Sequence, residues 1–270
     1  MSKSHRRKKN RKKRYPSDLS KGAWQVVKVL LPPAKSGGRP REIGFKKILN
    51  AIFYILKTGC QWAALPADFP HHKTVYHYFW TWRKAGIISQ IHDTLRARLR
   101  QKYGRHKHAT AGSLDSQSVK ATAISCPDRG YDGGKKINGR KRHILVDTIG
   151  LIMAVTVTSA ALQDRDGAKI LLQHLGGSCK KLRLIWVDGG YRGALLSWVS
   201  ERFKFVLSVV MRTDSQKGFK LLPRRWVVER TFGWLNHNRR LSKDYEVLPE
   251  TAEAMIQLAM IHIMARRLVS

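Results

Sequence analysis

Three acidic residues lie in short polar segments that could hold a divalent metal ion: Asp115 in GSLDSQSVKA, Asp188 in LIWVDGGYRG and Glu229 in RRWVVERTFGWLNHNRRL. Each aspartate follows an apolar run and precedes turn-compatible residues, so both are predicted to project from the carboxyl edge of a sheet. Carboxylate oxygens favour Mg²⁺ or Mn²⁺, and two such ions can hold the attacking and the leaving oxygen of a phosphoryl displacement. The two aspartates need a third acid to complete such a cage. The predicted chemistry is therefore the cutting and joining of phosphodiesters.

Glu229 meets the need for a third acid through its place on a helix predicted to begin near Arg225. At 100° per residue, Arg225, Gly233, Asn236 and Arg240 lie within about 40° of Glu229, and this sector carries no large apolar side chain. A Glu four residues after an Arg is usually a surface ion pair, but the two aspartates favour metal binding here. Arg225 is predicted to stabilise charge on the scissile phosphate or to neutralise a neighbouring one.

The charge balance points to nucleic acid as the partner. Lys and Arg number 52 against 18 Asp and Glu, which leaves a formal charge of +34 on 270 residues. A chain this cationic binds polyanions, and each neutralised phosphate steepens the salt dependence of binding. A membrane surface is the competing partner, but the sequence shows no lipidation motif, no amphipathic basic helix and no apolar run that could span a bilayer. We therefore predict a soluble, cytoplasmic protein without a membrane partner.

The sequence divides into a basic tail, two predicted domains and a linker. The tail of residues 1–15 is predicted to be disordered, a helical domain occupies 16–103, a linker 104–112 and an α/β domain 113–270. In the α/β domain the expected order is three strands, helix, strand, helix, strand and two helices, and the turn at residues 148–150 makes the second and third strands antiparallel. Three cysteines outside any CxxC pair are predicted to be reduced thiols.

The third helix of the helical domain, in HHKTVYHYFWTWRKAG, has the pattern of a helix-turn-helix recognition helix. Its apolar and aromatic stripe, formed by Val75, Tyr78, Phe79 and Trp82, is predicted to be core. The candidate contacts to DNA lie on its polar face: His72, Lys73, Thr74 and His77.

A basic run, DGGKKINGRKRH, separates the first strand of the α/β domain from the second. Its glycines have the spacing of a nucleotide-binding P-loop, but the required Lys and Ser or Thr are absent, which excludes an ATP site. The run is predicted to contact DNA phosphates near the metals, and a solvated basic hairpin is the alternative. The residues concerned are Lys135, Lys136, Arg140, Lys141 and Arg142.

Three further aspartates are set aside from the metal site. Asp164 and Asp166, with Gln163, resemble a helix N-cap box, where acids favour the helix dipole. Asp147 lies at the predicted hairpin and is explained by turn chemistry.

From about Tyr15 onward the chain resembles DDE transposases of bacterial insertion sequences, in the IS-five branch. The resemblance rests on TGCQWAALPADFPHHKTVYHYFWTW, LDSQSVKA, VDGGYRG and RWVVERTFGWLNHNRRLSKDYE in this order. It implies an RNase H-like catalytic domain, a mixed five-stranded sheet flanked by helices, behind a helix-turn-helix-like DNA-binding domain. It further implies that Asp115, Asp188 and Glu229 bind Mg²⁺, with Mn²⁺ as a substitute, as two ions.

The resemblance also implies the partners. These are double-stranded DNA, as the terminal repeats of the element and the target, and a second copy of the chain on paired ends, in the bacterial nucleoid. Of a related signature of Tyr, Arg, Glu and Lys, Arg225 and Glu229 match, whereas Leu222 and Asn236 depart. Asn236, Arg239 and Arg240 are predicted to face DNA. The alternatives are a nuclease or junction resolvase of the same fold that only hydrolyses, and a non-catalytic basic nucleic-acid-binding protein.

Overall fold

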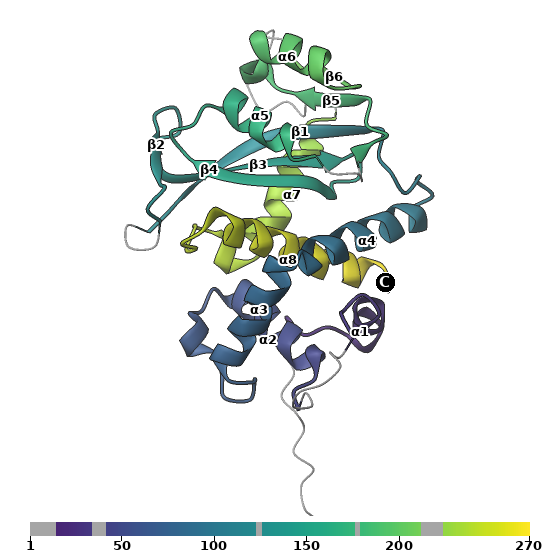
Figure 1. The fold of residues 1–270 in the computed structure, drawn as a ribbon, viewed down its shortest axis with the longest axis vertical. Helices are drawn as coiled ribbons and strands as arrows, with labels where there is room; N and C mark the ends of the chain where they lie inside the picture. The colour runs from purple at the N-terminus through teal and green to yellow at the C-terminus, as the bar shows by residue number, and fades with distance from the viewer. Residues whose placement is uncertain (1–14, 34–41, 123–125, 176–178, 212–223) are drawn as a thin grey trace, which may run out of the picture.

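Four helices lie in the amino-terminal part of the described chain, in agreement with the predicted helical region (Figure 1). A computed structural model describes residues 15–33, 42–122, 126–175, 179–211 and 224–270. The basic tail up to residue 14 and Leu222 lie outside the described residues. The helices are α1 (Lys21–Lys28), α2 (Phe45–Thr58), α3 (His72–Lys84) and α4 (Ile87–Lys102), with a 3-10 turn η1 (Trp62–Ala64) after α2.

The ends of these helices follow the capping rules. Ser20 caps α1 by accepting a hydrogen bond from the Ala23 amide. Gly86 precedes α4 at a φ of 69°. Gly59 ends α2 at a φ of 76°, where a side chain would be strained.

A mixed sheet forms the centre of the α/β part. Its strands are β1 (Ala111–Lys120), β2 (Gly130–Asp132), β3 (Ile137–Asp147), β4 (Ile152–Ser159), β5 (Leu184–Val187) and β6 (Val206–Val209). β3 is antiparallel to β1, β2 and β4, whereas β5 is parallel to both β1 and β6. The five predicted strands therefore run in the order β4-β3-β1-β5-β6, and the short β2 continues the outer edge beside β3. The predicted hairpin between β3 and β4 is confirmed.

Helices cover both faces of this sheet (Figure 1). One face packs on α5 (Asp164–Gln173) and α6 (Ala194–Arg202), and the other on α4, α7 (Trp226–Asn236) and α8 (Pro249–Arg267). β3 shows why both faces are covered: Ile144 and Val146 join the core beneath the sheet, and Leu145 joins the core above it. This arrangement is the predicted α/β fold of RNase H type.

The core beneath the sheet continues into the helical region without a break. α8, which is buried along most of its length, packs against α1, α2 and α4 on one side and β4 on the other. Buried residues of α1 to α4 and of the sheet therefore belong to one cluster. The division into separate domains at residues 104–112 remains a prediction.

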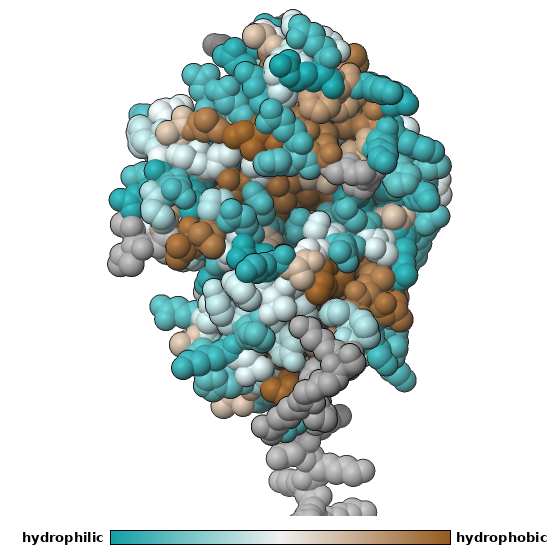
Figure 2. Space-filling model, in the orientation of Figure 1, coloured by the Kyte–Doolittle hydropathy of each residue, from teal (hydrophilic) through white to brown (hydrophobic). Residues whose placement is uncertain are grey.

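Two other expectations concern the whole chain. The three cysteines form no disulfide with one another, in agreement with the predicted thiols. None of the described helices is both long enough and apolar enough to cross a bilayer. Hydrophilic side chains cover most of the face shown in Figure 2, broken by apolar patches.

Candidate active site at the sheet edge

The pairing of β1 with β5 brings the two predicted aspartates to one place. Ser113 is the partner of Trp186, and the same parallel register continued by two residues sets Asp115 level with Asp188. β5 ends at Val187, so Asp188 lies at its carboxyl edge, where it accepts a hydrogen bond of 2.9 Å from the Gly190 amide. Asp115 lies in the middle of β1 and not at its end, because β1 continues along β3 beyond the last pair with β5.

Arg225 holds the two carboxylates together. One of its terminal nitrogens lies 3.4 Å from Oδ2 of Asp115 and 3.6 Å from Oδ2 of Asp188. The start of α7 is fixed at this point, because the Ser113 hydroxyl donates a 2.9 Å hydrogen bond to the Arg224 carbonyl. Arg224 has a φ of 71°, a strained value for a residue with a side chain. The chain thus turns sharply to place Arg225 over the aspartates.

Asp115 lies in an environment that disfavours its negative charge. Its side chain is only 18% exposed, against 34% for Asp188. Burial raises the pKa of Asp115 to about 6, and the Asp188 carboxylate adds to the rise, whereas the Ser116 amide, Arg225 and Lys135 oppose it. Arg225 therefore compensates the two aspartates only in part, and a stronger cation would be stabilised between them.

Glu229 lies one helical turn beyond Arg225 on α7, on a face that is exposed together with Gly233 and Asn236, as predicted. The structure does not bring it into one cluster with Asp115 and Asp188, because the described residues contain no group of three acidic, His or Cys side chains close enough to hold a metal. Two of the three predicted ligands are thus together, and the third is on the adjoining helix.

Several neighbours of the aspartates are not among the predicted site residues. Tyr191 is buried, and its pKa is well above the ordinary value. Burial is the main cause, and the negative charge of the nearby Asp115 is the second. The hydroxyl of Ser116 donates a 2.7 Å hydrogen bond to Asp164, the first residue of α5. Asp164 also pairs with Lys141 at 3.0 Å, so its role exceeds the helix capping that we expected. The sequence places Tyr191 only three residues after Asp188, which is the one feature that could have marked it.

The basic run, which spans the turn after β2 and the first half of β3, divides into exposed and buried residues. Lys135 and Lys136 are exposed, and Nζ of Lys135 lies 3.4 Å from the Ser116 carbonyl, beside Asp115. Both stay candidates for DNA contacts. Lys141 is buried against Asp164 and the Leu162 carbonyl, which contradicts its predicted contact with DNA.

The predicted DNA contacts of Arg140 and Arg142 are also wrong, because both side chains are buried. Arg140 donates to the carbonyls of Glu246 and Val247 at 2.9 and 2.7 Å. Arg142 donates to the Leu241 carbonyl at 2.7 Å. The segment after α7 covers this part of β3, so these guanidiniums bind backbone oxygens of their own chain.

The helix that carries Glu229 is shorter than predicted. α7 ends at Asn236, and Arg239 and Arg240 belong to a separate 3-10 turn, η4 (Arg239–Leu241). Arg240 is buried and bonds to Glu246 through two nitrogens at 2.8 Å, so it is unavailable to DNA. Asn236 and Arg239 are exposed and stay candidates.

α3 presents the polar face that the helix-turn-helix interpretation requires. Val75, Phe79 and Trp82 are buried, in agreement with the predicted core stripe. Lys73 and His77 are exposed, and His72 and Thr74 are partly exposed; all four stay candidates for DNA contacts. Two exposed aromatic residues, Tyr76 and Trp80, share this surface and were not predicted as contacts.

The fold and the paired aspartates define an α/β protein with a carboxylate centre at the edge of a mixed sheet. Residues 106–264 match the family described as "Transposase DDE domain", and residues 19–92 match "Putative transposase of IS4/5 family". The chain therefore belongs to the DDE transposase family of IS4/5 type.

Two proteins of Burkholderia cepacia are similar to parts of the chain. One, "Putative transposase for insertion sequence element IS402", is 29% identical over 133 residues, which cover 44% of this chain and 60% of that protein. The other, "Insertion element IS402 uncharacterized 16.2 kDa protein", is 30% identical over 105 residues, 36% of this chain and 69% of that protein. No solved structure matches the chain at a significant level.

Proposed function

We propose that the protein is a transposase that binds the ends of an insertion sequence and catalyses DNA cleavage followed by strand transfer. The observation that carries this proposal is the convergence of Asp115 and Asp188 on Arg225, in a chain of the DDE transposase family. The terminal repeats of the element and the target DNA are the proposed substrates. Because two ends have to be joined, we propose that at least two copies of the chain act together.

Divalent metal ions suit the site, because its donors are hard carboxylate oxygens and a single guanidinium compensates two of them. We propose that Asp115, Asp188 and Glu229 hold Mg²⁺, or Mn²⁺ in its place, as two ions. When bound, such ions polarise the attacking oxygen and stabilise the leaving oxygen of a phosphodiester. A metal between the aspartates would release Arg225 to neutralise the scissile phosphate or one beside it.

The surrounding exposed cations then serve to position DNA. Lys135 lies beside Asp115 and can reach a phosphate close to the reacting one. Lys136 shares its turn, and Asn236 and Arg239 lie beyond Glu229 on the exposed side. The polar face of α3 supplies a separate surface for binding the ends of the element. These contacts support orientation, which accounts for a large part of catalysis in phosphoryl transfer.

Substitution of Asp188 by Ala tests the proposal directly. DNA binding, Mg²⁺-dependent nicking and strand transfer into a plasmid are measured side by side for the wild type, Asp188→Ala and Asp166→Ala. Asp166 is a half-exposed carboxylate that pairs only with Lys169 among the described residues, so its loss serves as the matched control. We expect Asp188→Ala to bind DNA normally and to nick DNA more than about a hundredfold more slowly than the wild type. Loss of a residue that only hydrogen-bonds to a metal ligand already costs about 10- to 100-fold, and loss of a ligand itself should cost more.

Equal nicking by Asp188→Ala and the wild type would overturn the metal-site proposal. Nicking by the wild type without joined product would leave hydrolysis as the activity and exclude strand transfer. Absence of any metal-dependent nicking, with DNA binding intact, would instead establish a non-catalytic DNA-binding protein.

A further inference from the structure

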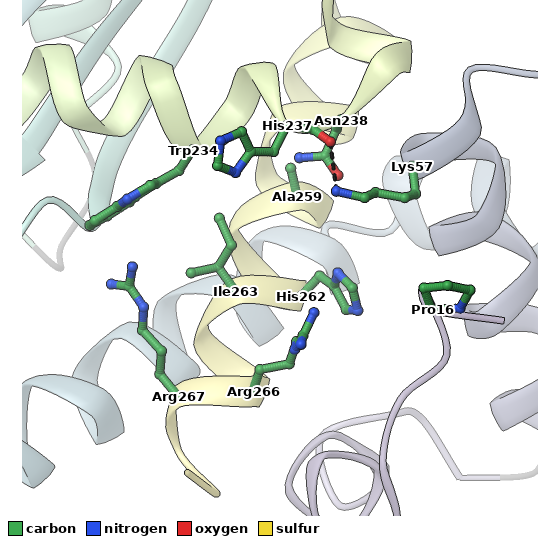
Figure 3. Close-up of a pocket in the computed structure, with 10 residues that line it drawn as sticks. All are labelled: Pro16, Lys57, Trp234, His237, Asn238, Ala259, His262, Ile263, Arg266 and Arg267. Carbon is green, nitrogen blue, oxygen red and sulfur yellow. Dashed lines mark hydrogen bonds between the residues drawn. The ribbon is translucent and has the colours of Figure 1, made fainter. Parts of the chain in front are cut away.

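A cavity of about 280 Å³ lies where the carboxyl-terminal ends of α2, α7 and α8 meet (Figure 3). It is much larger than one water molecule and lies just below the range of pockets that enclose drug-sized ligands. Its walls carry five basic residues and no acidic one: Lys57, His237, His262, Arg266 and Arg267. Burial lowers the pKa of His262 to about 4, so this ring adds no positive charge at neutral pH. The cavity is therefore of a size and charge to take one small anionic group.

The positive charge of this pocket is not compensated by the described part of the chain. None of its five basic residues forms an ion pair with a carboxylate of a described residue. Lys57 donates a 2.7 Å hydrogen bond to the His237 carbonyl, which positions its ammonium group at the rim. Arg266 is exposed. Lys57, Arg266 and Arg267 repel one another at neutral pH, and a bound anion would remove this repulsion.

His262 supplies a second, independent feature. Its ring is 8% exposed and stacks on Phe53 with centroids 4.6 Å apart, so it is held in a fixed orientation. Its Nε2 is buried without a hydrogen-bond partner among the described residues. Buried polar atoms nearly always have a partner, and an unpartnered one needs an explanation such as a ligand.

A row of alternating Trp and Arg side chains connects the pocket to the candidate active site. The Arg230 guanidinium lies 4.3 Å from the centroid of the Trp226 ring and 4.8 Å from that of the Trp234 ring. The Arg267 guanidinium lies 4.0 Å from the centroid of the same Trp234 ring. Trp226 directly follows Arg225, and Trp234 lines the pocket. The row spans about 12 Å along α7, or three to four base-pair steps of a duplex.

We propose that this pocket binds a backbone phosphate of the DNA, three to four base-pair steps from the scissile phosphate. Lysine and arginine side chains suit a phosphate. The Trp234 ring in the cavity wall, on which a base could stack, is already in contact with Arg230 and Arg267. The pocket joins α2 of the helical region to α7 and α8, so one phosphate contacts both parts of the protein. The proposal rests on the proposed function for its choice of DNA over free phosphate, which offers the same chemistry.

The test compares Lys57→Gln/Arg266→Gln with Lys180→Gln/Lys204→Gln. The control pair removes the same number of charges from exposed lysines that do not line the pocket. Binding of a short duplex taken from the DNA that flanks the coding sequence is measured in EDTA over a range of salt concentrations. We expect the pocket variant to lose about 0.9 from the slope of log affinity against log salt, the contribution of one phosphate, and the control to lose none.

A second arm locates the phosphate. Single neutral methylphosphonate linkages are placed along the duplex, and one of them, three to four steps from the cleavage point, is expected to weaken binding to the wild type but not to the pocket variant. Equal slopes for the pocket variant and the control would overturn the proposal. The proposal would also be overturned if inorganic phosphate raised the melting temperature of the wild type but not of the pocket variant, while the two proteins bound DNA equally. The pocket would then be a site for free phosphate and not for DNA.

These outcomes are separable from the test of catalysis, because EDTA excludes metal-dependent cleavage. DNA binding that does not depend on the pocket, together with nicking that still depends on Asp188, would refute the pocket alone. Binding through the pocket without any nicking would refute the catalytic proposal alone.

Discussion

Two groups of carboxylate and arginine lie at different places on the same sheet and differ in how fully their charges are satisfied. Asp147, at the end of β3, is fully buried, and its carboxylate receives Arg100 at 2.5 Å. It also accepts from two amides of its own turn, at 3.0 and 2.9 Å. Asp115 and Asp188 share one guanidinium, Arg225, at 3.4 and 3.6 Å. The first group is complete within the protein, and the second has capacity for a further cation.

The same distinction separates the basic residues. Arg140 is buried and its guanidinium is used by carbonyls of the chain, whereas Lys136, four residues earlier, is exposed. Burial and the number of internal partners therefore distinguish residues that stabilise the fold from residues that can act on a substrate. Residue type and proximity in sequence do not.

Asp147→Asn should give the largest loss of stability. The amide oxygen can still accept from the turn, so the substitution removes mainly the negative charge and leaves the buried Arg100 without its counter-ion. Breaking a buried pair in this way costs about 3 to 5 kcal/mol. Urea unfolding measures the loss, with Asp166→Asn at the surface as the control. A loss of less than about 1 kcal/mol, the range of exposed pairs, would show that the two groups do not differ as we argue.

Arg140→Met extends the comparison to the cations. The change leaves the Glu246 and Val247 carbonyls without their donor and removes the guanidinium that lies 3.8 Å from the buried Asp244 carboxylate, so the free energy of unfolding should fall by about 3 kcal/mol. Lys136→Met is the control, and its stability should stay within about 0.5 kcal/mol of the wild type. If both variants were equally stable, the assignment of Arg140 to the fold would be wrong.

The sequence predicts the partners of Asp147 only in part, and the reason is physical. Its turn contacts are local, within four residues, and follow from the chemistry of aspartate in turns. Arg100 lies 47 residues earlier and meets Asp147 only because α4 packs beneath the sheet. The run of Arg140 and Arg142 is similar, since its cover is a segment about a hundred residues later. Alternation along one strand carries no information on such distant contacts.

The candidate active site shows the same limit. The fold class, the five main strands and the meeting of Asp115 with Asp188 could be predicted, because apolar runs mark the strands and each aspartate follows such a run. That Asp115 lies in the middle of β1 was not predicted, because β1 continues along β3 after its pairing with β5 ends. The helical periodicity places Glu229 correctly on the exposed face of α7. Its distance from the aspartates depends on how α7 meets the sheet, which the periodicity does not fix. The extent of α7 beyond Asn236 was overestimated for the same reason.

Asp115→Asn should change stability in the opposite direction from Asp147→Asn. The folded-state pKa of Asp115, about 6, exceeds its ordinary value of 3.8, so the folded protein binds more protons than the unfolded chain between these values. Stability therefore falls as the pH rises from about 4 to about 6. Asn cannot ionise, and at pH 7 the variant should be more stable than the wild type by about 1 to 3 kcal/mol, the lower value allowing for lost attraction to Arg225.

The measurement is urea unfolding of both proteins at pH 4 and pH 7, in EDTA. The difference should appear at pH 7 and vanish near pH 4, where Asp115 is already mostly protonated in the fold. Other titrating groups change both proteins alike and cancel in the comparison. A variant less stable than the wild type at pH 7 would mean that Arg225 compensates Asp115 fully, and the contrast with Asp147 would then disappear.

Lys135→Gln should give the smallest effect, on DNA binding alone. The side chain is exposed and its nearest polar partner, the Ser116 carbonyl, is a distant 3.4 Å away, so stability should remain within about 0.5 kcal/mol. Its ammonium group lies beside Asp115, where a bound phosphodiester would be closest, and loss of one phosphate contact lowers the salt slope of binding by about 0.9. Lys204→Gln, at an exposed position in the turn between α6 and β6, should leave the slope unchanged. If the salt slope of Lys135→Gln also equalled that of the wild type, Lys135 would not contact a DNA phosphate. The exposed part of the basic run would then lose its proposed role in DNA binding.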